Sequence, residues 1–240
     1  MSRIIRVYLR NVFKQKAFYI SLVISFLLNV LIPFIVGLFV DFIGNETVAT
    51  EVISALISGI GIVETIYITM FVCSDFTEGA TKNYIGRGYT RRQVLNAKYI
   101  VSLIAILAFL ATYIIGDFIC FSKNGLGFDK SIGLLVIGTL FTLAANVGLY
   151  VVIANTTEKI GAAMAINLIL PNVIGMIFPA ITIITKSKVD YSKYWISGLN
   201  NIMSKTPNLN QTLLVVGLSI LYLIVLFEIS NLIIKKKEIK

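Results

Sequence analysis

The chain has 240 residues, of which 57% are hydrophobic and 14% are charged, and its formal net charge is +9. Soluble domains carry about 25% charged residues, so this composition, with a mean hydropathy of +0.88, predicts an integral membrane protein. The absence of histidine excludes histidine general bases and histidine zinc sites, and the chain has no GxxxxGK[ST] phosphate loop.

The N-terminal residues 1–16 have the pattern of an amphipathic helix. Basic residues recur there at three- and four-residue spacing and therefore share one helical face: Arg3, Arg6, Arg10 and Lys14. Ile4, Val7 and Phe13 supply apolar surface beside that face. We expect a helix that lies on membrane lipid at the inner leaflet; a solvated basic tail is the alternative. No small-residue cleavage site follows the first apolar stretch, so we expect no cleavable signal peptide.

Six apolar stretches are long enough to cross the hydrocarbon core as helices, which takes about 20 residues. They cover residues 17–40, 52–74, 94–121, 131–154, 160–185 and 211–234. Pro171 and Pro179 lie in the fifth stretch, where they could kink the helix or end it early. The sequence therefore predicts an all-α integral membrane protein with six transmembrane helices, forming a single domain over residues 1–240.

The basic residues are distributed unevenly between the predicted loops. With both termini in the cytoplasm, the inner set contains Arg3, Arg6, Arg10, Lys14, Lys16, Lys82, Arg87, Arg91, Arg92, Lys98, Lys159, Lys235, Lys236, Lys237 and Lys240. The outer set contains only Lys123, Lys130, Lys186, Lys188, Lys193 and Lys205. Because cytoplasmic loops are enriched in lysine and arginine, this predicts a multi-pass protein of the cell membrane with both termini cytoplasmic. The charge then indicates topology and attraction to anionic lipid, and we expect no nucleic-acid partner.

The longest predicted outer loop covers residues 186–210. It contains ring types that favour the lipid headgroup level, namely Tyr191, Tyr194 and Trp195. An apolar pattern continues after them through Leu199 and Met203. We therefore expect short extracellular helices, interfacial or re-entrant, before the last span.

A polar, glycine-containing loop, residues 75–93, separates the second and third apolar stretches. Glu78 to Ile85 is predicted to form a short helix, after which Gly86 and Gly88 permit a sharp reversal. The sequence TRRQ, which begins at Thr90, has the capping-box pattern of a helix start.

Two arginines follow this cap directly. Arg91 and Arg92 lie in the first turn of the next helix, where the helix dipole disfavours cations. Lipid phosphates or an acidic partner surface would favour them at that position. An ordinary basic inner loop is the alternative interpretation.

The pattern Glu78-Gly79-x-Thr81-Lys82, followed by Gly88-x-x-Arg91 and by Lys98 at the start of the third stretch, resembles the permeases of type-2 ABC exporters. Within that family the pattern is most similar to permeases of bacteriocin or lantibiotic immunity and of bacitracin resistance. The resemblance covers the whole chain, from the amphipathic start to the lysine-rich end. Two departures are Ala80, which interrupts the usual Glu-Gly-Thr run, and the two prolines of the fifth stretch.

The resemblance implies that the loop is a coupling helix that docks onto a separate ATP-hydrolysing subunit. Two permeases, identical or different, would assemble with an ATPase dimer, which would bind ATP and Mg²⁺. The chain itself would have no cofactor, no metal and no enzymatic activity. It would export an amphipathic or antimicrobial peptide or a hydrophobic compound. The candidate coupling residues are Glu78, Gly79, Thr81, Lys82, Arg87 and Arg91.

Glu64 is the charged residue nearest the middle of a predicted span. A charge at mid-membrane costs about 2.5–3.5 kcal/mol on insertion scales, so this carboxyl group requires a reason. It could line a substrate path and attract cationic substrates, or it could be a protonated or hydrogen-bonded packing residue. Asp117 and Glu228 lie nearer the ends of their stretches, where snorkelling or interfacial pairing is favoured over a substrate role.

Two rival classes of function are weighed against the exporter permease. A secondary transporter or channel would need no ATPase, but the chain has no evident repeat and few charges within its apolar stretches. An intramembrane enzyme is disfavoured because no histidine and no clear nucleophile–base pair is present. Co-purification with a nucleotide-binding subunit would separate the first class from both others.

Overall fold

The computed structural model describes residues 2–43, 46–77, 79–123, 130–185, 191–203 and 208–236. Side chains are described for the same residues except 32–34, 36–60, 77, 116–132, 201 and 236. These residues are almost all helical, with short non-helical connections between the helices. The elements are α1 (Ser2–Lys14), α2 (Lys16–Ile43), α3 (Glu46–Thr77), α4 (Ala80–Gly86), α5 (Arg91–Lys123), α6 (Lys130–Thr157), α7 (Ile160–Ile184), η1 (Tyr191–Tyr194), α8 (Ile196–Met203) and α9 (Leu209–Lys236).

Four of the described helices are long and apolar enough to cross a membrane. The qualifying segments are Arg91–Ile115 of α5, Gly133–Thr157 of α6, all of α7, and Leu209–Lys235 of α9. The first and second predicted spans correspond to α2 and α3, continuous helices of 28 and 32 residues whose side chains lie partly outside the described set. Long apolar helices in this number are compatible with a multi-pass, all-α membrane protein.

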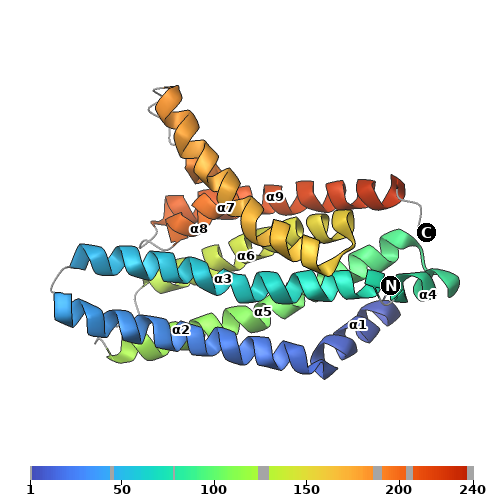
Figure 1. Cartoon of the computed structure of the whole chain (residues 1–240), viewed down its shortest axis with the longest axis horizontal. Coiled ribbons are helices and arrows are strands. Elements are labelled where there is room, and N and C mark those ends of the chain that lie inside the picture. The colour runs from blue at the N-terminus through green and yellow to red at the C-terminus, as the bar shows by residue number, and fades with distance from the viewer. Residues whose placement is uncertain are drawn as a thin grey trace.

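The long helices run alongside one another and define two ends of the molecule (Figure 1). Within this bundle α9 packs along α6, whereas α2 packs against both α3 and α5. Helix α1 meets the first part of α2 at an angle of 62°. The start of α1, the end of α9 and α4 lie at the same end, which we call the basic end (Figure 1).

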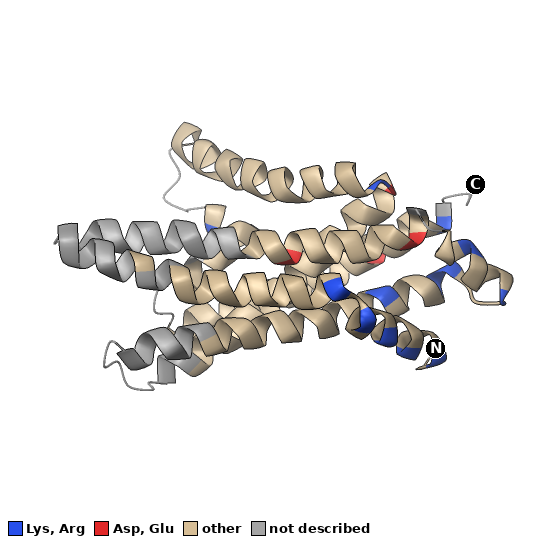
Figure 2. Cartoon of the chain, turned by 60° about the horizontal axis from the view of Figure 1, so that its bottom comes forward, with Lys and Arg blue, Asp and Glu red and all other residues tan. Residues whose placement is uncertain are grey.

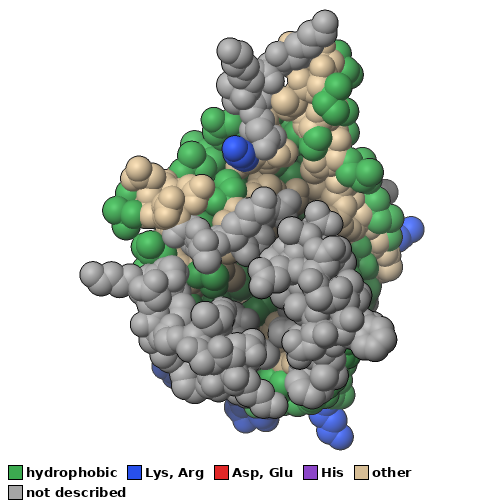
Figure 3. Space-filling model, turned by 90° about the vertical axis from the view of Figure 1, so that its left-hand side faces the viewer, with side chains coloured by type: hydrophobic (Ala, Val, Ile, Leu, Met, Phe, Trp, Pro, Cys, Tyr) green, Lys and Arg blue, Asp and Glu red, His purple; other side chains and the backbone are tan. Residues whose placement is uncertain are grey.

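Most of the described lysines and arginines gather at the basic end, on and around α1 and α4 (Figure 2). Seen from the opposite end, many of the coloured side chains on the flanks of the bundle are hydrophobic (Figure 3). The outward face of α7 illustrates this exposure, because Met176, Ile183 and Ile184 are 75%, 77% and 80% exposed. Apolar flanks with a concentration of cations at one end are the distribution expected of a helix bundle that sits in lipid.

Helix α7 continues through both of its prolines, so the expectation that they could end it early is not met. It leaves the bundle along part of its length (Figure 1). The short helices expected before the last span are present as η1 and α8. They pack against the protein, because Ile196, Leu199 and Met203 are buried and the Trp195 indole N–H donates to the Pro171 carbonyl at 3.0 Å. Their position relative to a membrane remains a prediction.

Candidate functional site

Helix α4 begins two residues later than the sequence pattern predicted. Gly79 has a left-handed backbone (φ 68°), which a helix cannot accommodate, so the helix starts at Ala80 rather than at Glu78. Glu78 itself lies outside the described residues. The helix ends at Gly86, and Gly88 (φ 88°) provides the expected reversal. The two left-handed glycines therefore set both ends of this short element.

The predicted capping box at the start of α5 is confirmed. The Thr90 backbone N–H donates to the Gln93 side chain at 3.0 Å, and the Gln93 backbone N–H donates to the Thr90 hydroxyl at 3.3 Å. These bonds satisfy donors that the first turn of a helix leaves open. The box fixes the direction in which the chain leaves α4 and enters the bundle.

Helix α1 is amphipathic, as its sequence predicts, and its buried face is a stripe of every fourth residue. Ile4, Tyr8 and Val12 are each 1% exposed, and they join the main hydrophobic core. The four predicted cationic residues, Arg3, Arg6, Arg10 and Lys14, are all exposed. Val7 and Phe13, expected to supply apolar surface, are 40% and 49% exposed and so face outward.

A buried polar cluster joins α1, α3 and α5 at the basic end. The Lys98 ammonium lies 3.1 Å from the Asp75 carboxylate, and it also donates to the Val72 carbonyl at 3.1 Å. The Tyr8 hydroxyl donates to the same carboxylate. The Phe76 ring lies 4.3 Å from the ammonium nitrogen, a cation–π contact. Lys98 is 2% exposed, so these contacts replace the water that would otherwise solvate its charge.

The cluster continues to α4 through aromatic rings. The Tyr8 ring centroid lies 5.3 Å from that of Tyr84 and 6.2 Å from that of Phe71. Burial, together with the Asp75 carboxylate, raises the pKa of the Tyr8 hydroxyl, and the same two causes raise the pKa of Tyr84. Both hydroxyls therefore stay protonated at neutral pH, and Tyr8 can act as the donor in its bond to Asp75.

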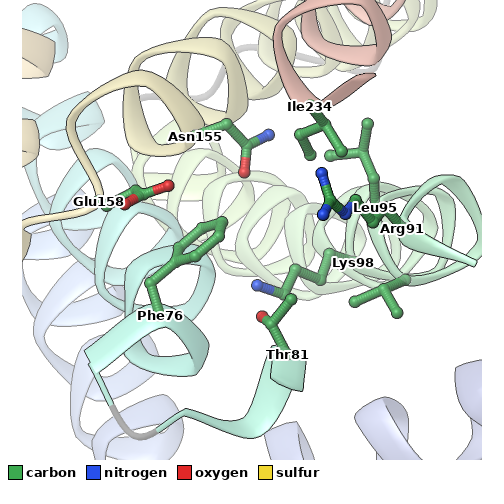
Figure 4. A pocket seen from close by; sticks show the side chains of 9 residues that line it. Phe76, Thr81, Arg91, Leu95, Lys98, Asn155, Glu158 and Ile234 are labelled. Atoms are coloured by element: carbon green, nitrogen blue, oxygen red, sulfur yellow. The ribbon is translucent and has the colours of Figure 1, made fainter. Parts of the chain in front are cut away.

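A small cavity of about 30 Å³ lies between α4, the start of α5 and the ends of α6 and α9. Arg91 and Lys98 line one side, and Asn155 and Glu158 face them across the opening (Figure 4). This volume is about that of one water molecule. The Arg91 side chain therefore shares the cavity with the Glu158 carboxylate. This acidic group inside the chain, like the lipid phosphates or acidic partner considered above, favours a cation in the first turn of α5, where the helix dipole disfavours one.

The structure separates the candidate coupling residues into two groups. Thr81 is 8% exposed and lines the cavity beside Arg91, so these two side chains point into the protein. Lys82 and Arg87 are exposed. Gly79 contributes its left-handed backbone. Among the candidates that the structure describes, Lys82 and Arg87 are placed to contact a partner directly, whereas Thr81 and Arg91 are placed to hold α4 against the bundle.

Glu64 is buried inside this chain and is 1% exposed. Glu64 does not line the cavity of Figure 4, and it does not line a second hollow, a cleft that lies between α1 and α4. Its Oε1 atom has no hydrogen-bond partner among the described residues. Nearby on α3, the Thr65 hydroxyl lies 2.8 Å from the Tyr150 hydroxyl of α6, and Thr69 accepts a hydrogen bond from Asn167 of α7 at 2.8 Å. Glu64 therefore lies inside the bundle, on the same helix as these two polar contacts.

The buried cluster was not predicted as a unit, although the sequence contained its signals. Asp75 directly follows the second apolar stretch and Lys98 lies near the start of the third, at positions where charges in low dielectric are usually paired. Tyr8 lies on the stripe of Ile4 and Val12, which identifies the inward face of α1. Which acid pairs with which base could be read only from the structure. The side chain of Asp117 lies outside the described residues, and Glu228 is exposed.

Comparisons with known proteins yielded no relative. No protein family model, no curated protein and no solved structure matches the chain.

Proposed function

We propose that the chain is the permease subunit of an ATP-driven ABC exporter. In this proposal α2, α3, α5, α6, α7 and α9 are six membrane spans, and the basic end, with both termini, faces the cytoplasm. Support for the orientation comes from the concentration of described cations on and around α1 and α4 (Figure 2), because lysine and arginine are enriched in cytoplasmic loops.

One observation carries the proposal: a short helix stands at the basic end with cations facing outward and its inner side fixed to the bundle. Lys82 and Arg87 are exposed on this element. Behind them, Tyr84 contacts Tyr8 of α1, and Thr81 lies in the cavity with Lys98. A helix held in this way can receive a force at its outer face and pass it to α1, α3 and α5. That is the requirement for a coupling helix docked on a motor.

The remaining parts of the proposal follow from the resemblance of the loop pattern to type-2 ABC permeases. Two permeases would assemble with an ATPase dimer, which binds ATP and Mg²⁺. The substrate would be an amphipathic or antimicrobial peptide or a hydrophobic compound, moved out of the cell. Exposed arginine and lysine side chains on α4 suit carboxylates on the ATPase surface.

Affinity purification of the chain in mild detergent, from the cells that produce it, tests this proposal. We expect a soluble protein with ATPase activity to co-purify in a one-to-one ratio. A chain that is purified alone and still transports in liposomes without ATP would instead be a secondary transporter or channel.

A further inference from the structure

A cleft of about 350 Å³ separates the first half of α1 from α4 and the connection to α5. It is lined by Arg3, Ile4, Val7, Tyr84, Arg87 and Tyr89. It is distinct from the cavity of Figure 4, with which it shares no lining residue. Tyr8 and the buried Asp75–Lys98 pair lie on the inner side of α1 and α4. The cleft belongs to the surface of the basic end.

The two arginines of this cleft have no acidic partner in the described part of the chain. The buried ion pair between Lys98 and Asp75 involves neither of them. Arg3 and Arg87 are exposed, and they approach the cleft from two different elements. Two guanidinium groups that converge on an open space favour a phosphate, which guanidinium binds in bidentate geometry. The neighbouring tyrosine side chains carry hydroxyls that can donate further hydrogen bonds.

The rest of the lining is apolar. Ile4 lies at the base of the cleft, and Val7 is 40% exposed at its side. At the α1–α2 bend, Phe13, Tyr19 and Ile20 are also exposed, at 49%, 51% and 57%. A ligand suited to this lining has a phosphate group at one end and hydrocarbon at the other.

We propose that this cleft binds the headgroup of an anionic phospholipid of the inner leaflet. The phosphate lies between Arg3 and Arg87, and the glycerol and the start of the acyl chains lie against Val7. A lipid bound there bridges α1 to α4 on the side of Arg87, and it leaves Lys82, which does not line the cleft, for the proposed ATPase partner. The Tyr8–Tyr84 contact holds the inner side of α4. The inference rests on the proposed placement of α1 at the membrane surface, but it does not depend on an ATPase partner.

Native mass spectrometry of the purified full-length chain tests this inference. The chain is equilibrated in micelles with equal amounts of phosphatidylglycerol and phosphatidylcholine, and bound lipid is counted after activation. Arg3→Gln/Arg87→Gln removes both cleft cations, whereas the control Lys16→Gln/Arg92→Gln removes two exposed cations of the same end that do not line the cleft. Loss of a charge-assisted contact weakens binding about tenfold or more. Arg3→Lys/Arg87→Lys keeps the charge and should restore part of the binding.

We expect wild type and the control to retain one phosphatidylglycerol in preference to phosphatidylcholine, and the cleft variant to lose this preference at least tenfold. Equal loss of the phosphatidylglycerol preference in the cleft variant and in the control would show general attraction of a basic surface and would overturn the site. Equal retention of the two lipids by wild type would also overturn it. Displacement of the lipid by millimolar inorganic phosphate would assign the cleft to free phosphate instead. A variant that elutes as a monodisperse peak in size exclusion is folded well enough for these comparisons.

Discussion

Lys98 of α5 and Asp75 of α3 form a buried ion pair with 3.1 Å between the ammonium nitrogen and the carboxylate oxygen. Tyr8 of α1 donates to the same carboxylate, so three helices meet at one acidic group. These helices surround α4 on its inner side. The charge pair therefore ties together the three helices against which α4 packs.

Removing one member of this pair should destabilise the protein more than removing both. Asp75→Asn leaves a buried ammonium without its counter-charge, and Lys98→Met leaves a buried carboxylate, so each should lower the free energy of unfolding by about 3–5 kcal/mol. The double variant should recover part of this loss. Denaturant unfolding in detergent micelles measures the cycle. If the double variant loses as much free energy of unfolding as the two single variants together, the residues are not energetically coupled. The pair would then not hold the helices together.

Gly198 permits the close packing of η1 against α8. A Cβ atom at this position would lie 1.8 Å from the Ser192 carbonyl oxygen, which is backbone and cannot turn aside. Gly198→Ala should therefore cost about 1–3 kcal/mol, the usual cost of overpacking.

Gly217 of α9 is the matched control, because a Cβ atom there would meet nothing within 4 Å. Gly217→Ala should be neutral or stabilising by up to about 1 kcal/mol. Thermal melting of both variants in detergent makes the comparison. Equal melting temperatures for the two would show that α8 does not dock as tightly as the structure indicates.

Glu64→Gln should leave assembly, stability and export unchanged. The side chain is buried within the chain, and neither described cavity is lined by it, so a neutral amide of the same shape fills its place. Complex yield, melting temperature and export of cationic and neutral peptides are the measurements. Selective loss of cationic-peptide export in a normally assembled variant would instead place Glu64 on the substrate path.

Much of the fold could be predicted from the sequence because hydropathy and helix-end signals act locally. Each of the six apolar stretches corresponds to a helix, and the Thr90 cap and the Gly88 reversal lie where the motifs place them. The start of α4 was wrong by two residues, because the left-handed conformation of Gly79 outweighed the helical pattern from Glu78 onward.

The candidate site could be predicted only in part, because its organisation depends on contacts between distant segments. The pattern identified the loop, but not that Thr81 turns inward while Lys82 faces outward. No local sequence signal predicts that the Tyr8 hydroxyl bonds to the Asp75 carboxylate across the basic end. Such pairings depend on the 62° bend between α1 and α2 and on the packing of the helices, which are tertiary relationships.

The orientation of the bundle can be measured with single cysteines. In a chain with Cys73 and Cys120 replaced by alanine, Lys82→Cys lies at the basic end, and Lys193→Cys lies on η1 in the predicted outer loop; both native side chains are exposed. We expect an impermeant thiol reagent added to intact cells to label only Lys193→Cys. Lys82→Cys should react after permeabilisation. Labelling of Lys82→Cys from outside would reverse the topology.

The most direct test of the coupling proposal is ATPase binding by variants of the outer face of α4. Lys82→Glu reverses a charge on the exposed face that we assign to docking, whereas Lys193→Glu reverses an exposed charge on η1. Since a charge-assisted contact contributes about 1.5–3 kcal/mol, we predict that Lys82→Glu recovers at least tenfold less of the co-purifying ATPase. Lys193→Glu should recover as much as wild type. Equal recovery of the ATPase by both variants would contradict a docking role for α4.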